Sequence, residues 1–190
     1  GANLRTTSML VDHDILVDAG TGVGDLSLAE LTRIDHIFLT HSHLDHVASI
    51  PFLVDTVGDL REAPLTVWAL PETIDALRKH VFNWVIWPDF SEIPTPEAPR
   101  LLFRPVAVGQ VVEVGARKVT VHRGDTVGVF ALHGHARERT DFVGYSRVTR
   151  RLKPRVGRAL RILRVGVGDR RMLVAVAVLI EEARATFAYQ

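Results

Sequence analysis

The sequence contains no cysteine among its 190 residues, and aromatic residues make up only 7% of it. The lack of cysteine excludes disulfide bonds, thiolate metal sites and cysteine nucleophiles, so any metal must be held by His, Asp or Glu. The longest apolar run, residues 172–180, is well short of the roughly 20 residues that span a bilayer. No charged stretch followed by an apolar one opens the chain. We therefore expect a soluble, cytoplasmic protein with no membrane partner.

The charge is nearly balanced over the whole chain but unevenly distributed along it. Residues 1–120 carry 9 Lys and Arg against 16 Asp and Glu, whereas residues 121–190 carry 14 against 6, and 13 of those 14 are arginine. We interpret the basic part as the solvated surface of an ordinary domain, with a nucleic-acid patch as the alternative. We expect one domain. Residues 1–122 show clear patterns of strands and helices, and residues 123–190 form a divergent basic part of the same domain.

Local patterns predict alternating strands and helices. Residues 5–11 and 14–18 are expected to pair antiparallel, and Ser27 with Glu30 forms a capping box that begins a helix. Further helices are expected to begin near Pro51, with Ser49 as its cap, and at Pro71, which starts a helix reaching residue 83. Strands are predicted at residues 36–40, 65–70, 101–108, 110–114 and 117–122, and a loop at residues 41–48. Beyond residue 122, periodicity does not decide the secondary structure. The candidates there are strands at residues 126–132 and 172–180 and a helix at residues 156–163.

The most informative segment is Thr40-His41-Ser42-His43-Leu44-Asp45-His46, which places three imidazoles and a carboxylate within six residues. Side chains two apart in an extended chain point the same way, so His41 and His43 are placed to bind one ion. Asp45 and His46 follow where the chain turns, and are placed to reach a second ion. Packing offers no reason for this set, because burying such groups unsatisfied costs several kcal/mol. The segment therefore predicts a site for two metal ions.

The histidine-rich segment resembles the signature of the metallo-β-lactamase-fold hydrolases. Within that superfamily, the chain is similar to the bacterial class II cyclic-nucleotide phosphodiesterases over residues 3–122. The segments that carry the similarity are Asn3-Leu4-Arg5-Thr6-Thr7-Ser8, Asp18-Ala19-Gly20-Thr21-Gly22-Val23-Gly24-Asp25-Leu26, Phe38-Leu39-Thr40 with the histidine-rich segment, Phe82-Asn83-Trp84 and Ile86-Trp87-Pro88-Asp89-Phe90.

The resemblance implies an α/β fold, the metallo-β-lactamase-like αββα sandwich, and hydrolysis of a 3′,5′-cyclic nucleotide by a metal-bound hydroxide. It implies two zinc ions, with another divalent metal as the alternative. Two ions about 3.5–4 Å apart lower the pKa of a shared water and hold both oxygens of an in-line displacement at phosphorus. By this resemblance His41 and His43 bind one ion, Asp45 and His46 bind the other, and Asp45 also acts catalytically by orienting the hydroxide. Asp18 is either the carboxylate partner of a metal-bound imidazole or a turn residue.

Beyond residue 122 the resemblance weakens. In the segment His122-Arg123-Gly124-Asp125-Thr126-Val127, the resemblance allows Asp125 to be the bridging metal ligand of a Gly-Asp-Thr turn, or an aspartate where the family has the histidine of a His-Thr-Val sequence. Asp125 is alternatively an ordinary turn residue. No histidine follows His135, so a late histidine ligand has no clear position. The chain also starts without the initial strand that such enzymes have. We therefore expect the sandwich to be incomplete or divergent in its C-terminal third, as a fragment or through alteration of that third, and its metal to be held weakly.

Two other functions stay open. A ribonuclease-type hydrolase would keep the same metal centre and use the arginine-rich part to bind phosphates. A non-catalytic metal-binding or nucleotide-binding remnant would bind without turnover. The aromatic residues Phe82, Trp84, Trp87 and Phe90 are expected to pack in the core or at a subunit interface, which leaves a homo-oligomer open. The alternative is a surface on which a nucleobase stacks.

Overall fold

The centre of the fold is a five-stranded sheet with the strand order β1-β2-β3-β4-β7. The structure, a computed structural model, describes residues 5–123, 128–133, 160–165 and 174–179, and the side chains of residues 5–122. Strands β1 and β2 pair antiparallel, as predicted, and β2, β3, β4 and β7 run parallel. The strands are β1 (Ser8–Val11), β2 (Ile15–Ala19), β3 (His36–Phe38), β4 (Leu65–Ala69) and β7 (Leu101–Pro105).

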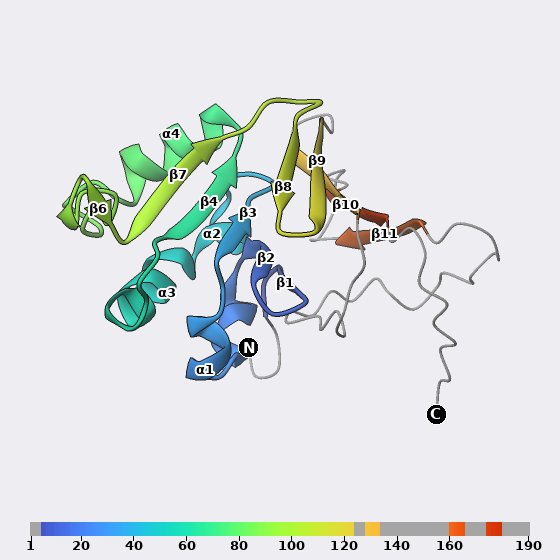
Figure 1. Cartoon of the computed structure of the whole chain (residues 1–190). Coiled ribbons are helices and arrows are strands. Elements are labelled where there is room, and N and C mark those ends of the chain that lie inside the picture. The colour runs from blue at the N-terminus through green and yellow to red at the C-terminus, as the bar shows by residue number, and fades with distance from the viewer. Residues whose placement is uncertain (1–4, 124–127, 134–159, 166–173, 180–190) are drawn as a thin grey trace.

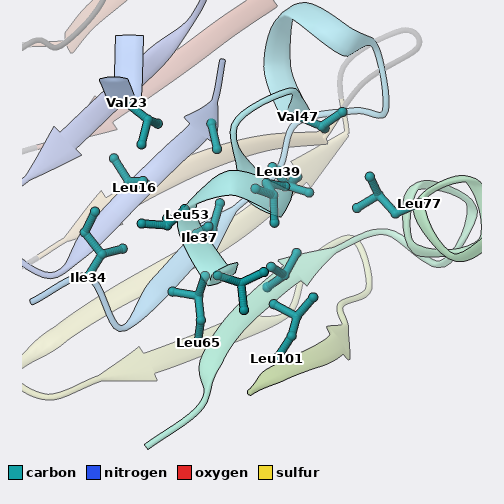
Figure 2. Close-up of a cluster of buried hydrophobic side chains, with 14 of the residues drawn as sticks. Leu16, Val23, Ile34, Ile37, Leu39, Val47, Leu53, Leu65, Leu77 and Leu101 are labelled. Atoms are coloured by element: carbon teal, nitrogen blue, oxygen red, sulfur yellow. The ribbon is translucent and has the colours of Figure 1, made fainter. Parts of the chain in front are cut away.

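Helices cover one face of this sheet, and Figure 1 shows α3 and α4 on that side. The helical elements are η1 (Thr21–Asp25), α1 (Leu28–Thr32), α2 (Leu44–Val47), α3 (Ile50–Val57), η2 (Gly58–Leu60) and α4 (Pro71–His80). The predicted capping box of α1 is present, with the Ser27 hydroxyl accepting from the Glu30 N–H. Leu16 and Ile37 of the sheet pack with Leu53 of α3 in one apolar cluster, which Figure 2 shows. None of the described helices is long and apolar enough to cross a membrane.

A second sheet covers the opposite face, on the other side of the central sheet in Figure 1. Alternation along β2 explains the two layers, because Leu16 belongs to the helix-side cluster while Ile15 and Val17 pack with Val119 and Val121 of β9. The strands of this sheet are β8 (Val111–Val114), β9 (Arg117–Arg123) and β10 (Gly128–His133). Two further pairs are β5 (Pro94–Thr95) with β6 (Ala98–Pro99), and β11 (Leu160–Val165) with β12 (Val174–Leu179). The predicted α/β class is confirmed: in the described residues, helices cover one face of the five-stranded sheet and the three-stranded sheet covers the other.

Some local predictions are wrong in detail. Residues 41–48 are not simply a loop, because α2 forms one short helical turn inside them. Its four residues are too few to show a helical period in the sequence. Ser49 precedes α3 but does not cap it, since its hydroxyl donates to the Gly20 carbonyl. Helix α4 ends at His80 rather than at residue 83. The sequence analysis left a helix at residues 156–163 undecided. The described residues from 160 onward instead form strand β11, which pairs with the apolar β12.

An arginine at the start of β9 ties the second sheet to the turn between β1 and β2. The Arg117 guanidinium donates to Asp14 Oδ1 at 2.6 Å and to Asp12 Oδ2 at 2.9 Å. All three side chains are largely buried, with exposed fractions of 13% for Arg117, 14% for Asp14 and 7% for Asp12. Burial opposes ionisation of Asp14, but the hydrogen bonds and positive charge of Arg117 lower the pKa of its carboxyl below 3.8.

We expect Asp14→Asn to reduce the free energy of unfolding by about 2 kcal/mol at neutral pH, because charge-assisted hydrogen bonds are lost. Since the folded-state pKa of Asp14 lies below the reference value of 3.8, the wild-type advantage is fully present above pH 3.8 and is lost as the pH falls through the folded value. Urea unfolding of both proteins from neutral to acidic pH measures this difference. The exposed Asp55, replaced by Asn, is the control. A deficit that does not shrink on acidification would contradict the assignment.

Candidate functional site

The histidine-rich segment lies at the edge of the sheet where parallel strands end. Strand β3 ends at Phe38, and β2 ends beside it at Ala19. Parallel neighbours bring their carboxyl ends to one edge, which is where open α/β sheets place their sites. The last residues of β2 are therefore next to the residues that follow β3.

The structure brings the three histidine rings of this segment together. The ring centroid of His41 lies 4.5 Å from that of His43 and 4.1 Å from that of His46. His41 and His46 are buried, whereas His43 is exposed and Asp45 is half-buried. An Asp45 carboxylate oxygen, Oδ2, lies 3.5 Å from His46 Nε2. The four side chains that the sequence analysis singled out in this segment are thus neighbours in space.

A buried carboxylate stands behind these rings. Asp18, in β2, has no exposed surface, and its Oδ2 accepts a hydrogen bond from His46 Nδ1 at 2.8 Å. Its Oδ1 accepts from the backbone N–H of Thr40 at 2.9 Å. The backbone of Asp18 has a φ of 59°, in the left-handed region that Asp tolerates better than most residues. Of the two interpretations of Asp18, the contact with a histidine of the segment is the one present in the structure.

The surroundings shift the two buried imidazoles in opposite directions. Burial, together with the positive charge of His46, lowers the pKa of His41 from 6.5 to about 4, so its ring is neutral at pH 7. Burial also disfavours a charged His46. There, however, the hydrogen bond to Asp18 and the negative charges of Asp18 and Asp45 raise the pKa above 6.5.

Gly20, just after β2, allows the histidine segment to approach the end of that strand. A Cβ at this position would lie 2.2 Å from the carbonyl oxygen of Asp45 and 2.4 Å from Thr6 Oγ1, closer than real Cβ atoms come. The Ser49 hydroxyl donates to the Gly20 carbonyl at 2.8 Å, and the Ser49 N–H donates to the Ala19 carbonyl at 2.9 Å. The segment is thus tied to β2 at both of its ends, through Asp18 at the start and Ser49 at the finish.

Not every predicted ligand joins this group. Asp125, the candidate bridging ligand, lies outside the described residues, as does His135. Across the part of the chain that the structure describes, no three His, Asp or Glu side chains are arranged so that they could hold a metal ion as they stand. The ligand roles of His41, His43, Asp45 and His46 therefore stay predictions. The structure shows that these four side chains are neighbours, and it shows no more about their role.

The aromatic stretch mostly packs, as we favoured. Phe82 is buried against Phe103, with ring centroids 5.7 Å apart, and Trp87 packs edge-on against Phe52 at 5.0 Å. Phe90 is partly buried against the helix-side cluster. Trp84 differs, because 60% of it is exposed at the tip of a turn that the Asn83 side chain holds by accepting from two backbone N–H groups. The exposed ring of Trp84 is what base stacking, the alternative use of this stretch, would require.

Three residues that support the site were not predicted to do so. Thr40 contributes both its N–H and its hydroxyl to the Asp18 carboxylate, Gly20 provides space, and Ser49 ties down the far end of the segment. A usable signal existed for Thr40, which directly precedes His41 at the end of a predicted strand, and for Gly20, which lies two residues after Asp18. The contact of Ser49 spans 29 positions and left no signal in the sequence.

Comparison with known families gives a match over residues 27–121, half of the chain, to the family model of the class-II cAMP phosphodiesterases. The matched range contains the whole histidine-rich segment and α2. It begins after Asp18 and Gly20 and ends within β9.

Individual proteins similar to the chain are of two kinds. A probable 3′,5′-cyclic-nucleotide phosphodiesterase of Yersinia pestis is 35% identical over 37% of this chain and 21% of its own length. A ribonuclease Z of Bradyrhizobium diazoefficiens is 31% identical over 82% of this chain and 46% of its own length. The chain thus spans less than half of either relative. Among solved structures, the metallo-β-lactamase fold protein YhfI of Bacillus subtilis aligns over 71% of this chain and 57% of its own, with 18% identity and a TM-score of 0.48.

Proposed function

Because the chain belongs to the class-II cAMP phosphodiesterase family, we propose that it hydrolyses a phosphodiester bond of a 3′,5′-cyclic nucleotide with the help of a divalent metal. The observation that carries this proposal is the gathering of His41, His43 and His46 within a few ångströms of one another, with a buried carboxylate behind them. A fold has no packing reason to bring imidazoles together in this way, whereas a metal site needs it.

The donor chemistry fits such a metal. Imidazole nitrogen and carboxylate oxygen are ligands that zinc accepts, and a chain without cysteine has no thiolate alternative. The Nδ1 atom of His46 is engaged by Asp18, so Nε2 is the atom of that ring available to a metal. A carboxylate on the far nitrogen is the usual support of a metal-bound imidazole. We propose that His41, His43, Asp45 and His46 supply the ligands of this part of the chain, that Asp125 adds one, and that two zinc ions bind.

When bound, divalent metal ions lower the pKa of a coordinated water and offset negative charge at phosphorus. The chain's own residues orient and desolvate the reacting groups. Asp18 holds the His46 ring through Nδ1, and burial keeps bulk water from the His41 and His46 rings. In this proposal the half-buried Asp45, whose Oδ2 lies 3.5 Å from His46 Nε2, orients the attacking water and accepts its proton.

The test is turnover by the purified chain with zinc or manganese. We expect conversion of cyclic AMP to an acyclic monophosphate, loss of that activity in the presence of a chelator, and a fall in kcat/KM of about 100-fold in Asp45→Asn. Asp55→Asn, on the exposed side of α3, is the matched control and is expected to keep wild-type activity. Chromatography of the nucleotide products gives the rates.

The same assay includes the alternatives. Cleavage of a structured RNA without turnover of cyclic AMP would overturn the proposal in favour of a ribonuclease, the kind of relative that covers most of this chain. Zinc and nucleotide binding with no turnover of either substrate would identify a non-catalytic protein.

A further inference from the structure

The hydroxyl of Thr40 lies between the buried carboxylate and the first histidine of the segment. Its Oγ1 is 2.9 Å from Asp18 Oδ2 and 3.0 Å from Asp18 Oδ1. On the other side, the same Oγ1 is 3.0 Å from His41 Nδ1. Thr40 is 1% exposed, so no bulk water competes for these contacts.

The direction of these hydrogen bonds follows from how many protons each group carries. A hydroxyl has one proton, and an ionised carboxylate only accepts. The proton of Thr40 is therefore donated to Asp18, because two oxygen atoms at 2.9 Å with no proton between them would repel. The oxygen of Thr40 is then an acceptor toward His41, and the proton of that bond must be on His41 Nδ1.

We propose that Thr40 is a positioning residue: through its hydroxyl it fixes the ring orientation of His41 and keeps the ring proton on Nδ1, so that Nε2 is the nitrogen offered to a metal. Asp18 orients His46 directly through Nδ1 and orients His41 indirectly through Thr40. One carboxylate thus sets both buried rings. The inference rests on the proposed function only where it refers to the metal.

The backbone of Thr40 strengthens this assignment. Its N–H donates to Asp18 Oδ1 at 2.9 Å, so main chain and side chain bind the same carboxylate and the hydroxyl has little freedom to turn away. The β-branched side chain also restricts rotation about χ1. Valine has nearly the same shape without the hydroxyl, and serine keeps the hydroxyl without the methyl group, so the two replacements separate hydrogen bonding from packing.

The first measurement uses the metal-free 190-residue chain and does not depend on metal binding. Nitrogen NMR of the imidazole rings distinguishes a proton on Nδ1 from one on Nε2, and the His41 signals are assigned by their loss in His41→Gln. We expect the Nδ1-protonated tautomer in the wild type and in Thr40→Ser, and a mixture of tautomers in Thr40→Val. A wild-type His41 protonated on Nε2 would overturn the proposal even if Thr40→Val failed to fold.

The second measurement is zinc affinity by competition with a coloured chelator. We expect Thr40→Val to bind zinc at least tenfold more weakly than the wild type, because loss of such supporting partners costs 10–100-fold in metal affinity. Thr40→Ser is expected to restore most of it. Equal affinity and equal tautomers in wild type and Thr40→Val would overturn the role of Thr40. Absence of zinc binding in the wild type would instead overturn the proposed function, while the tautomer measurement would still decide the inference.

Discussion

Asp18→Ala is expected to lower the free energy of unfolding by about 4 kcal/mol, the largest loss from a single side chain in the site. The carboxylate accepts from the Thr40 N–H, the Thr40 hydroxyl and His46 Nδ1, and all of these donors are buried. Each buried donor left without its acceptor costs about 1–3 kcal/mol. Alanine also fits the φ of 59° at this position less well than aspartate, which adds about 1 kcal/mol.

Two variants separate these causes by urea unfolding. Asp18→Asn keeps one carbonyl acceptor and tolerates the left-handed backbone, so we expect about half of the loss. Asp25→Ala removes an aspartate whose side chain is 45% exposed and paired with Arg5, and such surface pairs contribute less than about 1 kcal/mol. Equal midpoints for Asp18→Ala and Asp25→Ala would show that the buried carboxylate does not support the fold.

Gly20→Ala is expected to destabilise the fold by about 3 kcal/mol and to push the histidine segment away from β2. The added Cβ would lie 2.2 Å from the Asp45 carbonyl oxygen and 2.7 Å from the Thr7 carbonyl oxygen. Both of these contacts are with backbone, which moves less readily than the end of a side chain. Overpacking of a tight site costs about 1–3 kcal/mol, and this position is at the upper end. Urea unfolding measures the loss, and the NMR signals of the histidine rings report the displacement.

The neighbouring Gly24 provides the matched control, because a Cβ built there meets nothing within 4 Å. Both glycines lie in the stretch between β2 and α1, so the two variants differ mainly in the space around the added methyl group. Gly24→Ala is expected to be as stable as the wild type and to leave the ring signals in place. If Gly20→Ala behaved in the same way, the close approach of Asp45 to β2 would not exist in solution.

Features set by neighbouring residues were predictable from the sequence. The antiparallel pair β1 and β2, the capping box at Ser27 and the start of α4 at Pro71 all depend on contacts within a few positions. Helix α2 is also local, but it was not predicted, because the four residues Leu44–Val47 are too few to show a helical period. Ser49 was expected to cap α3, but a contact with Gly20, which is distant in the sequence, claims its hydroxyl instead.

In the candidate site too, features set by nearby residues were predicted, and most features set by distant contacts were not. The gathering of His41, His43, Asp45 and His46 follows from their spacing and was predicted. The predicted partner role of Asp18 matches a contact that joins β2 to His46. The roles of Thr40 and Gly20 were not predicted, because they depend on how closely two parallel strands bring their ends together. The only signal in the sequence was the position of each residue beside the end of a predicted strand. Asp125 is still a prediction, because it lies outside the described residues.

Asp18 and Gly20, two supports of the histidine segment, precede it in the chain by about twenty positions. The Gly20 N–H donates to the Thr7 carbonyl, and the backbone N–H groups of Thr6 and Thr21 each donate to the hydroxyl of the other residue. An expression boundary placed at the start of the matched family range, residue 27, would keep every histidine of the segment. It would also remove β1, β2, Asp18 and Gly20, so the histidine rings would lose the residues that hold them in place. We therefore expect the smallest unit that holds these rings in place to begin at or before Thr6.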